Sequence, residues 1–269
     1  MAARRDSGDR MGGGGAVRFV VAYEGTRYSG WQRQTNGRAV QSVLEGALRE
    51  LEGRDVAALG ASRTDAGVHA LGQVAWAETR RPLSPDRYRT ALNALLPEDV
   101  RVRACDLPEG RFQPLRGVIE KTYTFRLDLS PVPDPRMRRV AVHHPGRLDL
   151  DAVNAALSHL LGRHDFRHFA SSGGGARTTE RHLREAHAEM VADGALLRFT
   201  ADGFLYHMVR NIVGAGLRVG EGRAGQDYLA RILREGPPPT GIKLAPAHGL
   251  TLVGIAYGPP SPLDSRQVP

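Results

Sequence analysis

The order of strand and helix patterns constrains the fold of this sequence more than any other feature. In the first part of the chain, an alternating or apolar pattern predicts strands, and apolar residues three and four apart predict helices. The predicted elements are a strand at 17–23, a helix at 39–51, strands at 56–59 and 68–77, a helix that begins after Ser84 and ends before Pro97, and a strand at 100–104. This order is that of a ferredoxin-like domain.

The second part of the chain gives the same order with insertions. The predicted elements are a strand at 118–129, a helix capped by Asp149, strands near 183–191 and 196–201, a helix at 204–219 and a strand at 250–257. We therefore expect an α+β protein of two ferredoxin-like (RRM-like) subdomains, at 17–110 and 111–258. A disordered basic and Gly-rich tail at 1–16 and a second tail at 259–269 are expected to flank them.

The charge of the chain indicates a polyanionic partner. The net charge is +8 and the pI is near 10.2, and only Lys121 and Lys243 among the 37 basic residues are lysine. Arginine binds phosphate through two parallel hydrogen bonds and stacks on bases, so nucleic acid is the first partner to consider. No apolar run is long enough for a membrane span, and the single cysteine, Cys105, can form no internal disulfide. We expect a cytoplasmic protein without membrane contact.

One polar segment between two predicted strands has the composition of a functional loop. Residues 60–74 read GASRTDAGVHALGQV, which places Asp65 at the tip of a loop, near an arginine and a histidine. Catalytic residues often lie on such loops, although Asp and Gly are also common in ordinary surface turns. Neither a phosphate-binding P-loop nor a dinucleotide fingerprint occurs, and the histidines lack the companions of a metal site, so no metal is expected.

Two further residues are candidates for a site with Asp65. Tyr123 stands on the strand predicted at 118–129, where it is either a core aromatic or a functional hydroxyl. Arg210 lies between Met208 and Ile212 of a predicted helix and points away from that apolar side, either into solvent or toward a site. These residues form a site only if the fold brings them together.

Six blocks of the sequence resemble the tRNA pseudouridine synthase A family. The resemblance spans roughly 17–257, and its most specific block is Arg-Thr-Asp-Ala-Gly-Val-His at 63–69. The blocks are YEG at 23–25 with GWQRQ at 30–34, VQ at 40–41 with LE at 44–45, RTDAGVHA at 63–70, KTY at 121–123, FL at 204–205 with MVR at 208–210, and AP at 245–246 with GL at 249–250.

The resemblance implies a fold and an activity. The fold would be a pair of ferredoxin-like subdomains that share a curved antiparallel sheet across a basic cleft. The activity would be isomerisation of uridine to pseudouridine in the anticodon arm of tRNA, at positions 38–40, by a homodimer that needs no cofactor. A catalytically silent tRNA-binding module on the same fold is the alternative.

The resemblance also implies roles for individual residues. Asp65 would be the catalytic carboxylate, acting as nucleophile at C1′ or as base at C2′, and Arg210 would pair with it. Tyr123 would lie against the uracil and assist proton transfer from C5. The predicted substrate-binding residues are Tyr123, Arg63, His69 and Leu250, of which Arg63 would face the RNA backbone and Leu250 would pack near the base.

The sequence departs from the family pattern at two places. Ser62 stands where the family usually has glycine, which would strain the loop if that residue needs a positive φ. Gln113 and Leu115 replace the histidine and arginine of a Phe-His-Ala-Arg pattern, so a polar contact is lost or shifted to Arg116. We expect this second departure to affect RNA affinity or the choice of modified site.

Overall fold

The computed structural model describes residues 15–108 and 112–258 of the 269-residue chain. The predicted tails, except for residues 15 and 16, lie outside the described residues, as does the predicted subdomain boundary at 110. Ala16, which we placed in the tail, is instead the first residue of a strand.

A single sheet of ten strands runs through the described part of the molecule. Its order is β4-β1-β3-β10-β5-β9-β8-β7, with β2 beside β3 and β6 beside β5. All pairs are antiparallel except β10 with β3 and β5 with β6. The strands are β1 Ala16–Tyr23, β2 Ala58–Gly60, β3 His69–Glu78, β4 Val100–Asp106, β5 Val118–Asp128, β6 Val142–His143, β7 Gly162–Asp165, β8 Glu180–Val191, β9 Gly194–Ala201 and β10 Leu250–Tyr257.

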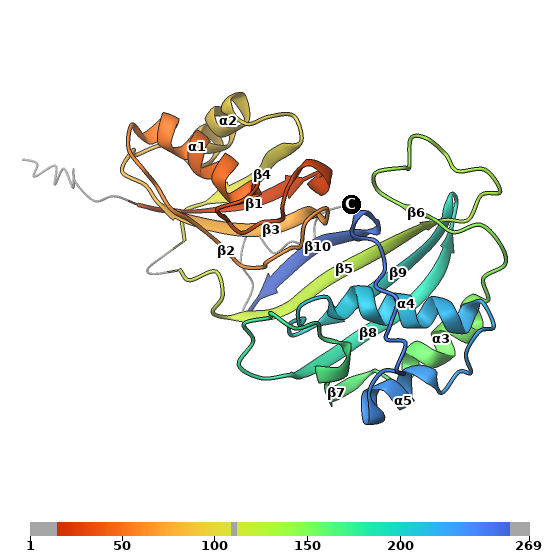
Figure 1. Ribbon diagram of the computed structural model, residues 1–269. Coiled ribbons are helices and arrows are strands. Elements are labelled where there is room, and N and C mark those ends of the chain that lie inside the picture. The colour runs from red at the N-terminus through yellow and green to blue at the C-terminus, as the bar shows by residue number, and fades with distance from the viewer. Residues whose placement is uncertain (1–14, 109–111, 259–269) are drawn as a thin grey trace, which may run out of the picture.

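Helices pack on the sheet in two groups. Figure 1 shows α1 and α2 beside the strands of the first part of the chain, and α3, α4 and α5 beside those of the second part. The helices are α1 Val40–Glu52, α2 Pro85–Leu95, α3 Leu150–Ser158, α4 Met208–Gly220 and α5 Tyr228–Glu235, with short 3-10 turns at Gly25–Arg27, Arg167–Phe169 and Ala247–Gly249. The protein is therefore an α+β structure, as the sequence predicts.

Local capping signals place two helix starts where the sequence predicts them. The side chain of Ser84 accepts a hydrogen bond from the backbone N–H of Arg87 at 3.4 Å, and Pro85 is the first helical residue. Asp149 caps α3 in the same way, by accepting from the N–H of Ala152 at 3.0 Å. Both predictions are confirmed.

The helix predicted at 204–219 begins four residues later than expected. It starts at Met208, because His207 has a left-handed backbone with φ of 62° and ends the regular helical geometry on that side. Phe204 and Leu205 therefore precede the helix. The sequence analysis also did not predict α5 or the short strands β6 and β7.

One edge of β3 pairs with two different strands. Its C-terminal end pairs with β2 at residues 75–77, and its N-terminal end pairs with β10 at residues 69–70. The strand β2 therefore diverges from β3 just where β10 begins to pair with it. The loop at 61–68, which joins β2 to β3, lies at this divergence and carries Asp65.

Among the described residues, no helix is both long and apolar enough to cross a membrane.

A second loop, after β1, lies directly against the loop that carries Asp65. At Gly30 the backbone has φ of +95°, and a Cβ atom there would lie 2.4 Å from the backbone oxygen of Thr64. Only glycine allows this close approach in that conformation. Gly46 of α1 is the opposite case, because a Cβ there would meet nothing within 4 Å.

We expect opposite effects of alanine at these two glycines. Gly30→Ala should lower the free energy of unfolding by about 2–4 kcal/mol, through backbone strain and overlap with Thr64. Gly46→Ala should raise it by about 0.5–1 kcal/mol, because alanine favours helix. Urea denaturation measures both changes. Equal effects of the two substitutions would contradict this account of the loop packing.

Candidate active site

The loop that carries Asp65 is fixed by its neighbours on both sides. The side chain of Gln73 accepts from the backbone N–H of Ser62 at 3.1 Å and donates to the Ser62 oxygen at 2.6 Å. On the other side, the backbone N–H of Trp31 donates to the backbone oxygen of Thr64 at 3.1 Å. Because these groups are buried, the bonds hold the loop in one conformation.

Asp65 forms an ion pair with Arg210, as predicted. The distance between Arg210 Nη1 and Asp65 Oδ2 is 3.3 Å, and the two side chains are only 13% and 20% exposed. Arg210 is oriented by a second contact, because its Nε donates to the backbone oxygen of Ala245 at 2.7 Å. The arginine therefore approaches the carboxylate from a fixed direction and forms a charge-assisted hydrogen bond with it.

His207 is a neighbour of Asp65 that the sequence analysis missed. Its Nε2 lies 3.5 Å from Asp65 Oδ2, and its Nδ1 lies 3.0 Å from the Ser171 hydroxyl. Burial lowers the pKa of His207, the charge of Asp65 opposes this, and that of Arg210 adds to it. The sequence did contain a signal, since this histidine stands three residues before Arg210. The helix was expected to begin at residue 204, however, so His207 was placed inside it instead of just before its first residue.

The backbone of His207 is strained. Among the described residues other than glycine, it alone has a positive φ. A side chain in this conformation costs about 1–2 kcal/mol. Such strain tends to occur where a side chain must reach a functional group, and here it directs the imidazole toward Asp65.

Tyr123 lies on β5 beside the same loop. Its hydroxyl is 3.0 Å from the Ser62 hydroxyl, and its ring packs edge to face on Phe204 with the centroids 5.2 Å apart. Burial raises the pKa of Tyr123 to about 12, with a partly compensating effect of the Ser62 hydrogen bond and a further increase from the charge of Asp65. Tyr123 is therefore a neutral hydroxyl near neutral pH.

A large cavity brings most of the predicted site residues together. It has a volume of about 1420 Å³, and its lining includes Asp65, Tyr123, Arg210, Arg63 and Leu250. Arg63 is exposed at this surface. The cavity is large enough for an extruded nucleotide with its flanking sugar and phosphate groups.

His69 does not join this group. It is 4% exposed, and its Nδ1 accepts from the N–H of Gly25 at 2.9 Å, while its Nε2 is 3.1 Å from the oxygen of His248. Both ring nitrogens are thus engaged by backbone groups, so the histidine supports the loop and does not contact the cavity. His69 is the first residue of β3 and is not part of the cavity lining, so its predicted contact with substrate stays a prediction.

The two departures from the family pattern have different structural outcomes. Ser62 does not have a positive φ, so the expected strain is absent, and its hydroxyl instead contacts Tyr123. Gln113 and Leu115 both lie at the surface and line the cavity, where Leu115 is 72% exposed. The segment that departs from the pattern therefore faces the site.

Residues 15–108 and 112–258 contain no group of three or more His, Cys, Asp and Glu side chains arranged to hold a metal ion.

Comparison with known proteins identifies the family of this chain. Residues 19–112 and 156–258 match the tRNA pseudouridine synthase family. The chain belongs to that family. It is 37% identical to tRNA pseudouridine synthase A of Acetivibrio thermocellus over 241 residues, which cover 90% of this chain and 99% of the relative. It is 40% identical to the protein of the same name from Myxococcus xanthus over 252 residues, which cover 91% and 94% of the two chains.

The family match agrees with the geometry of the site. Asp65 lies in the first matched stretch and Arg210 in the second, so the ion pair joins the two parts that this family shares. Tyr123 lies between these stretches. As a member of this family, the protein is a pseudouridine synthase, an isomerase.

The strain at His207 leads to a prediction about stability. His207→Ala and His207→Gly both remove the imidazole, but only glycine adopts the left-handed conformation freely. The glycine variant should therefore be more stable than the alanine variant by about 1 kcal/mol. Thermal or urea unfolding of the two variants measures this difference.

Arg218 provides the control, because it is exposed in the same helix and lies at a regular helical position. There the order should be reversed, with Arg218→Ala more stable than Arg218→Gly by about 1 kcal/mol. An alanine variant at 207 that is as stable as the glycine variant would mean that the backbone there is not strained.

Proposed function

We propose that this protein isomerises uridine to pseudouridine in the anticodon stem-loop of tRNA, at positions 38–40. The observation that carries the proposal is the Asp65–Arg210 ion pair in the wall of the large cavity, in a chain of the tRNA pseudouridine synthase family. The relatives bear the name tRNA pseudouridine synthase A. Binding of RNA alone gives no reason to place a carboxylate in a cavity that receives a polyanion.

Asp65 is the catalytic carboxylate in this proposal. The reaction breaks the bond between ribose C1′ and uracil N1, rotates the base in place and joins C5 to C1′. Attack on C1′ and removal of the C2′ proton both need an ionised carboxylate, and Arg210 lies 3.3 Å from Asp65 as the partner of that charge. The second hydrogen bond of Arg210, to the backbone oxygen of Ala245, keeps the guanidinium beside Asp65 when a substrate phosphate is near.

Tyr123 and Leu250 hold the base in this proposal. The Tyr123 ring is kept in place by Phe204 and its hydroxyl by Ser62, so that the ring offers a fixed surface to uracil. After C5 has bonded to C1′, the proton on C5 must leave, and N1 gains one. The Tyr123 hydroxyl assists the first of these transfers, and Leu250 packs against the base from the opposite strand, β10.

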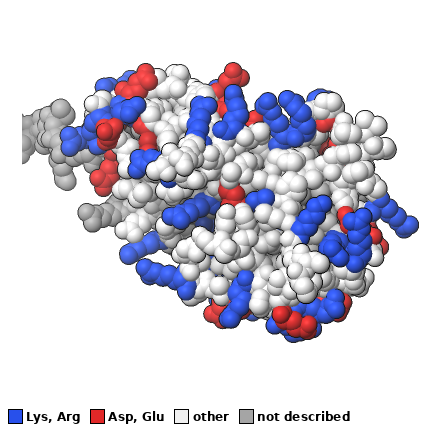
Figure 2. Space-filling model, in the orientation of Figure 1, with Lys and Arg blue, Asp and Glu red and all other residues white. Residues whose placement is uncertain are grey.

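Two ferredoxin-like subdomains with a basic cleft between them form the RNA-binding scaffold in this proposal. The strand orders β4-β1-β3-β2 and β10-β5-β9-β8 support it, because each follows the ferredoxin order in its own half of the chain. Figure 2 shows Lys and Arg side chains spread across one face of the molecule, with most acidic side chains near its edges. Arg63, exposed beside Asp65, contacts the RNA backbone here.

We further propose that the enzyme acts in the cytoplasm as a homodimer and needs no cofactor. The single cysteine and the absence of a spanning helix among the described residues fit this setting. Light scattering in solution tests the dimer, and a mass of about 29 kDa, that of one chain, would exclude it.

Replacement of the carboxylate tests the catalytic assignment. Asp65→Asn should lower pseudouridine formation on unmodified tRNA by at least about a thousandfold, because an amide can act neither as nucleophile nor as base. The affinity for tRNA should change little. Base-specific chemical mapping of pseudouridine measures the product, and it should locate the product at positions 38–40 with the wild-type protein.

Asp193→Asn is the matched control, since this carboxylate is exposed and pairs with Arg126 away from the cavity. It should leave activity unchanged. Normal turnover by Asp65→Asn would show that another residue is the catalyst. No product with wild type would leave the silent tRNA-binding module as the function of this chain.

Salt dependence tests the basic scaffold. The affinity for tRNA should fall by more than about tenfold between 50 and 200 mM salt, because each phosphate contact releases bound counterions. A filter-binding or fluorescence titration at several salt concentrations gives the slope. A flat response would contradict binding through phosphate contacts.

A further inference from the structure

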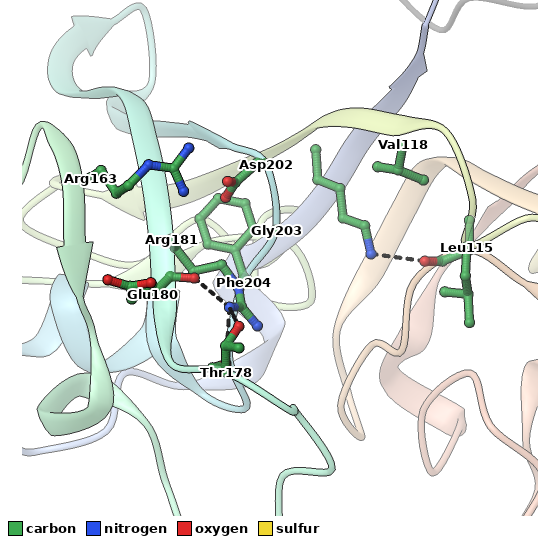
Figure 3. Close-up of a pocket in the computed structure, with 11 residues that line it drawn as sticks. Leu115, Val118, Arg163, Thr178, Glu180, Arg181, Asp202, Gly203 and Phe204 are labelled. Carbon is green, nitrogen blue, oxygen red and sulfur yellow. Dashed lines mark hydrogen bonds between the residues drawn. The ribbon is translucent and has the colours of Figure 1, made fainter.

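A second cavity adjoins the catalytic one. Its volume is about 430 Å³, and it shares four lining residues with the larger cavity. Figure 3 shows Arg163, Arg181 and Phe204 on one side of it and Leu115 and Val118 on the other. The shared residues are Ala61, Leu115, Lys121 and Phe204. A substrate in one cavity therefore lies next to the other.

Three cations line this second cavity without a carboxylate partner. Lys121, Arg163 and Arg181 form no ion pair within 4.0 Å in the part of the chain that the structure describes. Two carboxylates, Glu180 and Asp202, also line the cavity. Burial lowers the pKa of Arg181, and the charge of Asp202 partly opposes this. The lining thus carries one more positive than negative charge.

The bonds of Lys121 and Arg181 are all to neutral oxygens. Lys121 Nζ donates to the backbone oxygen of Ala61 at 2.8 Å and lies 3.3 Å from the Ser62 hydroxyl. Arg181 Nη1 donates to the backbone oxygens of Thr178 and Glu180 at 3.0 and 2.6 Å. These contacts hold the cations in place but do not neutralise them. A half-buried cation in this state favours a bound anion.

We propose that this second cavity binds an RNA backbone phosphate that flanks the target uridine, through Lys121 and Arg181. The inference rests on the proposed function and adds a subsite to it. The phosphates next to a nucleotide held at Asp65 are the nearest anions that the substrate offers, and Lys121 lies in the wall that the two cavities share. Its contact with Ser62 joins this phosphate site to the catalytic loop.

The same geometry places the phosphate contact two residues from Tyr123 along β5. Residues i and i+2 of a strand face the same side, about 7 Å apart. Lys121 and Tyr123 therefore contact neighbouring parts of one nucleotide. Phe204 packs on the Tyr123 ring and also lines the second cavity. Binding of the phosphate fixes the backbone on one side of the extruded base.

Uncharged phosphates in the RNA test this subsite. An anticodon stem-loop RNA is prepared with one methylphosphonate at each phosphate around the target uridine, and the dissociation constant is measured with wild type and Lys121→Gln. At one flanking phosphate, removal of the charge should weaken wild-type binding by about tenfold or more. In Lys121→Gln the same replacement should cost less than about twofold, since the partner is already absent.

Two further variants keep the test decisive. Arg181→Gln should reduce the cost at the same phosphate, and it provides the result if Lys121→Gln does not fold. Arg184→Gln is the control, because Arg184 lies on β8 like Arg181 but is exposed and pairs with Glu120. In this variant the uncharged phosphate should still weaken binding by the full tenfold. If the cost at every phosphate is the same in wild type, Lys121→Gln and Arg181→Gln, the proposal is wrong.

Proton uptake gives an independent measurement. Burial, and then the charge of Arg181, lower the pKa of Lys121 to about 8. The charged groups that face this site are Lys121, Arg163, Arg181, Glu180 and Asp202. A phosphate bound among them would raise the pKa of Lys121. Binding of RNA at pH 8.5 should therefore take up protons with the wild-type protein, and fewer protons with Lys121→Gln. Calorimetry in buffers of different ionisation enthalpy measures the difference. Equal uptake by both proteins would overturn the phosphate contact.

These binding measurements separate the subsite from the proposed activity. They use affinities and proton counts, which do not require turnover. A wild-type protein that forms no pseudouridine but shows the coupling would retain the subsite and lose the proposed function. The reverse result would retain the function and reject the subsite.

Discussion

The ion pair between Asp65 and Arg210 is the contact on which the site depends. Its two members are 145 residues apart in the chain, and they come from the loop between β2 and β3 and from helix α4. Neither would be stable alone in its place, because a mostly buried charge without a partner is costly. The backbone around each is accordingly fixed: Gln73 and Trp31 hold the loop of Asp65, and Ala245 holds the side chain of Arg210.

The sheet makes this pairing possible through the way its strands divide. The edge of β3 accepts β2 at one end and β10 at the other, so the loop between β2 and β3 emerges where the two parts of the sheet meet. Arg210 reaches the same place from α4, which packs on the second part. Catalytic side chains from distant segments thus converge at a junction that backbone hydrogen bonds define.

Much of the fold could be predicted from the sequence, because periodicity and capping act locally. The strand at 250–257 and the start of the helix at Pro85 were predicted at their observed positions. The start of α4 was not, since no local pattern reports the left-handed conformation of His207 or the contacts of its side chain with Asp65 and Ser171. For the same reason His207 was missed as a neighbour of Asp65, whereas the pairing of Asp65 with Arg210 followed from the family resemblance. His69 shows the converse limit, because a residue close in sequence to the loop of Asp65 has a buried side chain bonded to backbone groups, which its position in the sequence does not report.

The position of β10 has a consequence for how the protein is made. This strand is the last described element of the chain, yet it lies in the middle of the sheet between β3 and β5. Chains are synthesised from the N-terminus, so the other nine strands emerge from the ribosome before the one that joins them. Until β10 inserts, the edges of β3 and β5 that it will cover remain open, and open edges invite pairing with other chains. Joining of the two parts through contacts so distant in sequence is also slow. The same strand that completes the catalytic junction therefore determines how long a newly made chain is vulnerable to aggregation.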